Sequence, residues 1–141
     1  MEIAIKIASS VQNDVPVGAV IVKDGEIISI ASNSKENTHD ITAHAEITAI
    51  KKAEEFLHNW RLDDCDLYVT LEPCPMCAWA ILQSRIKNVY FGSYDNQYGA
   101  LGSKLNLTLY SNQKVNIKGG ILEDKCNKLL NDFFRKVRDD N

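Results

Sequence analysis

The fold of this chain can be worked out from two stretches, Thr42-Ala43-His44-Ala45-Glu46 and Glu72-Pro73-Cys74-Pro75-Met76-Cys77. His44 offers an imidazole, and Cys74 and Cys77 offer two thiolates. Zinc usually takes four tetrahedral ligands, so three protein ligands leave one position for water, as a catalytic site requires. Glu46 follows the histidine closely and is left over as a carrier of protons. An apolar helical pattern follows each stretch, so we expect both halves at helix N-termini, with His44 in the first turn of its helix.

The segments around these stretches predict strands that alternate with helices. Asp24-Gly25 is a strong hairpin signal between two β-branched segments, 15–22 and 26–31, which we expect to be strands. The other expected elements are a helix at 2–13, a polar loop at 32–42, a helix at 43–56, a strand at 66–71, a helix at 75–84, a strand at 88–91, a glycine-rich loop at 95–103, an ambiguous segment at 105–110, a short strand around 115–117 and a closing helix at 122–138. The alternation predicts one α/β domain, 1–141, folded as a three-layer α/β/α sandwich around a mixed sheet of about five strands.

The composition is that of an ordinary globular protein. Of the 141 residues, 45% are hydrophobic and 25% are charged, which is enough for one domain with a core. The formal net charge is -3. The overall charge therefore gives no sign of nucleic-acid binding, and any surface that binds RNA has to be a local patch.

The four cysteines fit a reducing compartment better than an oxidising one. Two belong to the C-x-x-C of the metal motif, and Cys65 and Cys126 form no recognisable disulfide framework with them. The first residues lack the basic segment and long apolar run of a signal peptide. No apolar run approaches the roughly 20 residues of a membrane span. We expect a cytoplasmic protein that does not enter the membrane.

The metal motif also indicates a reaction. Helix N-termini favour the thiolate form of Cys74 and Cys77, and zinc lowers the pKa of a bound water from about 15.7 to about 7. The resulting hydroxide could attack a ring carbon that bears an amino group, with Glu46 moving the protons. C-x-x-C alone would fit a redox pair or half of a structural zinc site equally well. The added H-x-E and the proline before the first cysteine favour the pattern of zinc nucleobase deaminases.

Residues well beyond the metal motif carry a family resemblance. They are 15–20, 31–33, 39–40, 60–62, 67–74, 84–86, 91–92, 99–103 and 129–135. With them the chain resembles the cytidine deaminase superfamily. Two segments resemble its tRNA-specific adenosine deaminase branch. They are the glycine-rich loop, with Asp95, Gly99 and Gly102-Ser103, and the closing helix, with Phe133-Phe134-Arg135. Ile41 stands where that branch usually has proline, and Tyr98 where it has a smaller residue.

The resemblance implies hydrolysis of the wobble adenosine of an arginine tRNA anticodon, A-C-G, to inosine, with release of ammonia. It implies one zinc ion per subunit, held by His44, Cys74 and Cys77, and Glu46 as the catalytic residue. It also implies a homodimer whose active sites are completed across the interface, with the tRNA anticodon stem-loop as partner. The substrate-binding residues that it implies are Val17, Asn33, Ala45, Asp95, Phe134 and Arg135.

Two other functions fit the same residues. A deaminase of free guanine, cytosine or a nucleoside would share every catalytic residue, but its binding would lack the salt dependence that phosphate contacts produce. A non-catalytic zinc module would need a fourth ligand, from Cys65 or Cys126. Single residues also have simpler interpretations: Asn33 and Asp95 as turn formers, Phe134 as a core anchor, and Arg135 as part of a solvated helix end.

Overall fold

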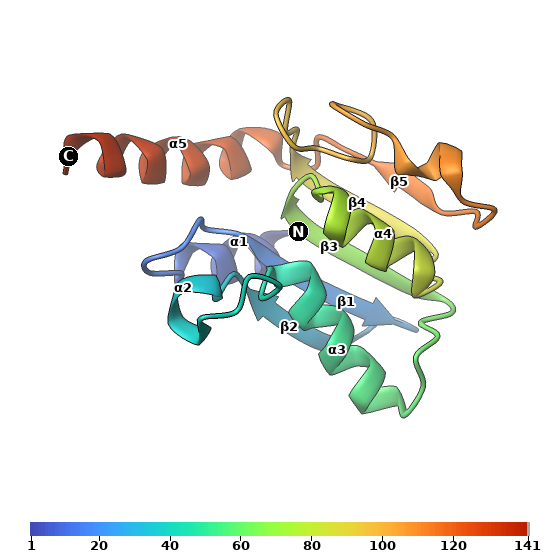
Figure 1. Cartoon of the computed structure of the whole chain (residues 1–141). Helices are drawn as coiled ribbons and strands as arrows, with labels where there is room; N and C mark the ends of the chain where they lie inside the picture. The colour runs from blue at the N-terminus through green and yellow to red at the C-terminus, as the bar shows by residue number, and fades with distance from the viewer. Residues whose placement is uncertain (141) are drawn as a thin grey trace.

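One mixed sheet lies at the centre of the computed structural model, which describes residues 1–140 (Figure 1). Its strands are β1 (Gly18–Lys23), β2 (Glu26–Ser32), β3 (Cys65–Leu71), β4 (Asn88–Ser93) and β5 (Asn116–Lys118). The strand order is β2-β1-β3-β4-β5. β1 is antiparallel to β2 and to β3, whereas β3, β4 and β5 are parallel. The predicted mixed five-stranded sheet is confirmed.

Helices cover both faces of the sheet. α3 (Ala45–Leu57) packs on β1 and β2, and α4 (Pro75–Gln83) lies beside it on the same face (Figure 1). α1 (Glu2–Ser9) packs on the other face, and α5 (Glu123–Asp139) runs from β4 past α1 and extends beyond the sheet. The α/β fold expected from the sequence, with three layers, is therefore confirmed. No helix within residues 1–140 is long and apolar enough to cross a membrane.

Small residues bring the layers close together. Ala45, Ala49 and Ala53 are fully buried on the face of α3 that meets the sheet. Leu67 and Val69 of the central strand β3 are also fully buried. On the opposite face, α1 crosses the start of β1 so closely that a Cβ at Gly18 would lie 2.1 Å from the carbonyl oxygen of Ala4. Only glycine permits this approach, which explains the break in the β-branched run.

The hairpin predicted at Asp24-Gly25 is present between β1 and β2. Both turn residues have positive φ, 52° at Asp24 and 79° at Gly25, as a two-residue type I′ turn requires. The first strand begins at Gly18 rather than at residue 15. Pro16 offers no backbone N–H to a sheet ladder, and its neighbours Val15 and Val17 line a large cavity instead of extending the strand.

Two segments near the N-terminus differ from the sequence prediction. α1 ends at Ser9, not near residue 13, because the hydroxyls of Ser9 and Ser10 bond to carbonyls of the last turn and Asn13 has a φ of 68°. The expected loop at 32–42 contains the short helix α2 (Lys35–Thr38). The carboxylate of Asp14 accepts hydrogen bonds from the N–H of Glu36, so a distant residue satisfies this first-turn donor.

Three further boundaries follow from local backbone conformation. His44 is the N-cap of α3 and not part of its first turn, because its ψ of 150° is extended. The ambiguous segment at 105–110 contains a 3₁₀ helix, η1 (Leu107–Tyr110), and the side chain of Asn106 accepts a hydrogen bond from the N–H of Thr108 to cap it. α5 begins only at Glu123, after Leu122 with its φ of 51°.

Candidate metal centre and active site

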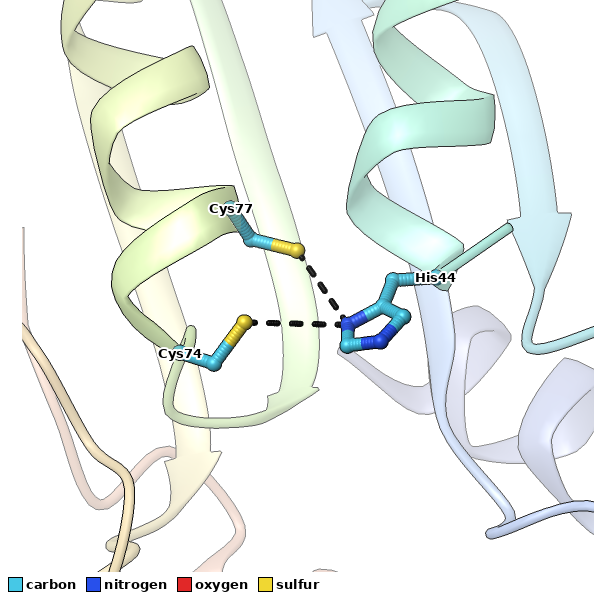
Figure 2. A group of neighbouring side chains, drawn as sticks. All are labelled: His44, Cys74 and Cys77. Carbon is cyan, nitrogen blue, oxygen red and sulfur yellow. Dashed lines mark hydrogen bonds between the residues drawn. The ribbon is translucent and has the colours of Figure 1, made fainter. Parts of the chain in front are cut away.

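Three possible metal ligands meet where α3 and α4 begin. His44 is the N-cap of α3, Cys74 is the N-cap of α4, and Cys77 lies in the first turn of α4. The Nδ1 atom of His44 lies 3.7 Å from the Sγ of Cys74 and 3.4 Å from the Sγ of Cys77 (Figure 2). All three donor atoms lie within 4.8 Å of one another. The fold thus brings together residues from two distant parts of the sequence.

Local sequence sets the two sulfur positions. Pro75 occupies the first turn of α4, where its missing N–H costs no hydrogen bond and its fixed φ suits the helix. Cys74 remains extended, with φ −72° and ψ 173°, and its carbonyl accepts the N–H of Ala78 at 2.8 Å. The spacing of C-x-x-C therefore places both sulfurs on one side of the helix start, next to its positive dipole end.

The three side chains share protons in a way that suits exchange for a cation. A hydrogen bond from the Cys77 thiol, together with His44, lowers the pKa of Cys74 to about 4. The bond to Cys74 and burial raise the pKa of Cys77. The bond to Cys74 also raises the pKa of His44. A divalent cation would replace the protons on His44 and Cys77, so metal affinity should increase with pH.

The donor set fits zinc with one position left open. Two thiolates and one imidazole are ligands that zinc accepts. Cys65 and Cys126, the possible fourth ligands, lie outside the group that residues 1–140 form. The Cys65 sulfur lies 3.7 Å from the carbonyl of Asp63, and the Cys126 sulfur lies 3.9 Å from that of Ile121. Neither thiol supports the closed four-ligand site of a structural zinc module.

Glu46 lies in the first turn of α3 and lines the same cavity as His44 and Cys74. Its side chain is buried, and only 4% of the residue surface is exposed. Burial, reinforced by the negative Cys74 sulfur, raises the pKa of Glu46 from its usual 4.5 to about 7. A carboxyl group that gains and loses a proton near neutral pH is suited to general acid–base chemistry.

A cavity of about 810 Å³ opens over the ligand group. It is lined by four of the residues predicted to bind substrate, Val17, Asn33, Asp95 and Phe134. Ala45 does not line the cavity: it is buried, and its N–H donates to the Oδ1 of Asn33 at 2.8 Å. Arg135 does not line it either, because its exposed side chain points along α5 towards Asp132, 4.0 Å away.

Asn33 and Asp95 have structural hydrogen bonds and remaining capacity for a ligand. The Nδ2 of Asn33 donates to the carbonyl of Val15 at 3.1 Å, and its Oδ1 accepts from Ala45. One amide hydrogen and one oxygen lone pair remain. The Oδ1 of Asp95 accepts from the N–H groups of Gln97 and Tyr98, each at 3.0 Å, so Asp95 does form a turn. Its second carboxylate oxygen has no protein partner among the described residues.

Sequence reasoning missed part of the cavity wall. Asn127, Leu130 and Asn131 line it together with Phe134. These positions follow the i, i+3, i+4, i+7 spacing of one helix face, and this spacing could have identified them. Lys35 at the start of α2 is the single lysine or arginine among the lining residues. Nothing in the sequence near Lys35 indicates that α2 reaches the cavity.

Comparisons with known proteins agree with this geometry. Residues 2–138 match the family model described as MafB19-like deaminase. The chain is 43% identical to a tRNA-specific adenosine deaminase of Bacillus subtilis, over 98% of this chain and 88% of the relative. It is 47% identical to a tRNA-specific adenosine deaminase of Aquifex aeolicus, over 90% of this chain and 85% of the relative.

Solved structures separate two kinds of relative. A structure from a study of A-to-I editing by tRNA:A34 deaminases at the wobble position of transfer RNA has a TM-score of 0.90 and 40% identity, and covers 92% of this chain and 97% of that one. A guanine deaminase of Bacillus subtilis has a TM-score of 0.65 and 41% identity, over 77% of this chain and 71% of that one. These matches confirm the resemblance inferred from sequence. The chain belongs to the MafB19-like deaminases and to the family of tRNA-specific adenosine deaminases.

Proposed function

We propose that this protein hydrolyses the wobble adenosine of a tRNA anticodon to inosine and releases ammonia. The buried Glu46 beside an open group of one imidazole and two thiolates carries the proposal, because this is the arrangement that hydrolytic deamination needs. The names of the relatives support tRNA as the substrate. An arginine tRNA with the anticodon A-C-G is the proposed target, and a cytoplasmic location follows from it.

The proposed cofactor is one zinc ion per subunit, held by His44, Cys74 and Cys77. When bound, zinc supplies a water of lowered pKa as the nucleophile. Glu46 takes a proton from the attacking water and delivers protons to N1 of the ring and to the departing amino group. Adenosine and water thus become inosine and ammonia. The raised pKa of Glu46, about 7, suits a group that must both accept and donate.

The cavity walls suggest how a flipped-out nucleotide would be held. Asn33 has a free amide hydrogen and a free lone pair for the edge of the base. Val17 offers an apolar surface, and Phe134 of α5 offers an aromatic ring. We propose that Asp95 contacts the neighbouring sugar with its second carboxylate oxygen. Lys35 offers the positive charge at the rim that phosphates require.

A free-base deaminase is the second candidate, and the similarity to a guanine deaminase favours it. The two functions would share the zinc ligands and Glu46, so the other residues that line the cavity would have to distinguish their substrates. In this chain, residues of α5 and residues 94–98 line the cavity together with the ligand group. The more extensive structural match to the A34 deaminase supports the RNA substrate over the free base.

Inosine formation tests the proposal directly. Purified protein is incubated with an arginine tRNA anticodon stem-loop that carries A-C-G, and zinc content is measured in parallel. We expect inosine at the first anticodon base with the native protein, and almost none with Glu46→Ala, which retains zinc. Cys74→Ser should lose both zinc and activity, whereas the matched control Cys65→Ser should keep both. Release of ammonia from guanine or cytosine, with no inosine in the stem-loop, would replace this proposal by the second candidate.

We further propose that the protein acts as a homodimer, as the family resemblance implies. The exposed faces of α4 and η1 carry large apolar side chains, and these two elements contact each other. Met76, Trp79, Leu109 and Tyr110 are exposed by 38% to 77%, and we refer to them as the α4–η1 patch. A second copy of the chain would remove this apolar surface from water.

A further inference from the structure

We propose that Glu72 is a positioning residue, which holds the substrate loop at residues 94–103 against the metal-binding turn so that Asp95 faces the substrate. Glu72 itself takes no part in the proton transfers assigned to Glu46. The inference rests on the proposed function, because it concerns how this site holds an RNA nucleotide. The metal chemistry does not use Glu72, so this role is additional to that chemistry.

The hydrogen bonds of Glu72 carry the first step. Its side chain is almost fully buried, with 2% of the residue surface exposed. One carboxylate oxygen accepts from the N–H of Asp95 at 3.1 Å and from the hydroxyl of Ser103. The other oxygen accepts from the N–H groups of Leu101 and Ser103, each at 3.1 Å. One side chain thus ties the two ends of the loop together.

Glu72 also belongs to the turn that carries the metal ligands. It follows β3 directly and lies two residues before Cys74, and its own N–H donates to the carbonyl of Ser93 at 2.8 Å. The neighbouring Pro73 carbonyl accepts the N–H of Ala100 at 2.9 Å. Two consecutive residues of the metal-binding turn therefore bond to the loop, which fixes the distance between the two.

The donors around Glu72 are specific for a carboxylate. Every partner is an N–H or O–H donor, so both oxygens must act as acceptors. No lysine, arginine or histidine pairs with Glu72 among the ion pairs of residues 1–140. Gly99 completes the fit, because a Cβ there would lie 2.5 Å from the Cδ of Glu72. The loop is thus shaped around this side chain.

The position of Asp95 depends on this anchor. Its N–H bonds to Glu72, while its Oδ1 bonds to the N–H groups of Gln97 and Tyr98. Asp95 and the four residues around it, from Tyr94 to Tyr98, all line the cavity. Loss of the Glu72 acceptor would release the backbone at the point where the loop approaches the substrate. The expected effect is weaker substrate binding, with little change in the chemical step.

Glu72→Gln tests this role with almost no change in size. The amide can accept on one side only, so at least one N–H of the loop loses its partner. We expect KM for the stem-loop to rise about tenfold while kcat changes less than about threefold, with zinc retained at one per chain. Ser103→Ala, which removes one donor and leaves Glu72 in place, should raise KM by about threefold. Glu55→Gln on the exposed surface of α3 is the matched control and should change neither constant.

A double-substitution cycle separates positioning from general stability. If Glu72 acts through Asp95, KM of Glu72→Gln with Asp95→Ala should be no higher than that of Asp95→Ala alone. Three outcomes would overturn the inference and leave the proposed function intact. They are an unchanged KM in folded Glu72→Gln or in Ser103→Ala, additive effects of Glu72→Gln and Asp95→Ala on KM, and loss of zinc from Glu72→Gln. Absence of inosine with the native protein would instead overturn the proposed function, and this inference with it.

Discussion

At the scale of the residue, Glu46, the proposed carrier of protons, destabilises the fold when it is ionised. A carboxyl group in water has a pKa near 4.5, and burial raises that of Glu46 to about 7. The folded protein therefore disfavours the ionised form of Glu46, which is the form that a general base needs. Such a conflict between stability and chemistry is expected at active sites and not in the core around them.

This conflict predicts a pH-dependent gain in stability for Glu46→Gln in the metal-free protein. Because the pKa of Glu46 is higher in the folded state, its protonation stabilises the fold at low pH, and that contribution is lost as pH rises from about 4.5 through about 7. At pH 8, the free energy of unfolding of the variant should be higher than that of the native protein by on the order of 2–3 kcal/mol. At pH 4.5 the two should be nearly equal.

Urea unfolding of both metal-free proteins under reducing conditions measures this difference. The native protein and the variant are compared at pH 4.5 and at pH 8 with the same chelator, so that both proteins are free of metal. A stability difference that does not change between the two pH values would show that Glu46 is not the group responsible.

At the scale of the element, the sequence predicts what local pattern determines. The hairpin at Asp24-Gly25 and the alternation of helices with strands follow from periodicity and turn chemistry, and both are confirmed. α2 could not be predicted, because the donor of its first turn is satisfied by Asp14, far away in the sequence. His44 caps α3 rather than entering it, and only its backbone conformation shows this.

The same limit applies to the candidate site. The possible metal ligands lie in two short motifs, so the sequence alone was enough to single them out. The roles proposed for Glu72 and Lys35 depend on contacts with residues that the chain brings close only after folding. A carboxylate that binds backbone N–H groups has no sequence pattern, whereas a zinc ligand set does.

Two helices offer different cations for the phosphates of RNA, and the structure favours α2. Lys35 lines the cavity and forms none of the ion pairs among residues 1–140, whereas Arg135 lies outside the cavity near Asp132. Lys35→Ala should reduce the slope of log affinity against log salt by about 0.7, the value for one contact with single-stranded RNA. Arg135→Ala should leave the slope nearly unchanged.

These slopes are measured by titrating the stem-loop at several salt concentrations. Each substitution is made in the Glu46→Ala protein, which cannot turn over the substrate. Lys87→Ala, directly before β4 and outside the lining of the cavity, is the matched lysine control. A larger change in slope for Arg135→Ala than for Lys35→Ala would show that the RNA runs along α5 instead.

At the scale of the whole molecule, charge and apolar surface point to different partners. The net charge of -3 opposes long-range attraction of RNA, so binding has to depend on local contacts inside the cavity. The α4–η1 patch lies on elements that pack against each other, and its side chains stay in contact with water in the single chain. Large exposed apolar patches mark protein interfaces, and a second copy of the chain is the proposed partner.

Leu109→Glu should therefore convert a dimer into monomers. Leu109 is 77% exposed in the single chain, so a glutamate there costs the monomer little, but a dimer would have to bury its charge. Light scattering during gel filtration should give twice the chain mass for the native protein and the chain mass for the variant. Ile27→Glu, on the edge strand β2 and 48% exposed, is the matched control and should stay dimeric. If active sites are completed across the interface, inosine formation should fall with dimer content in Leu109→Glu; a fully active monomer would show that each site is complete within one chain.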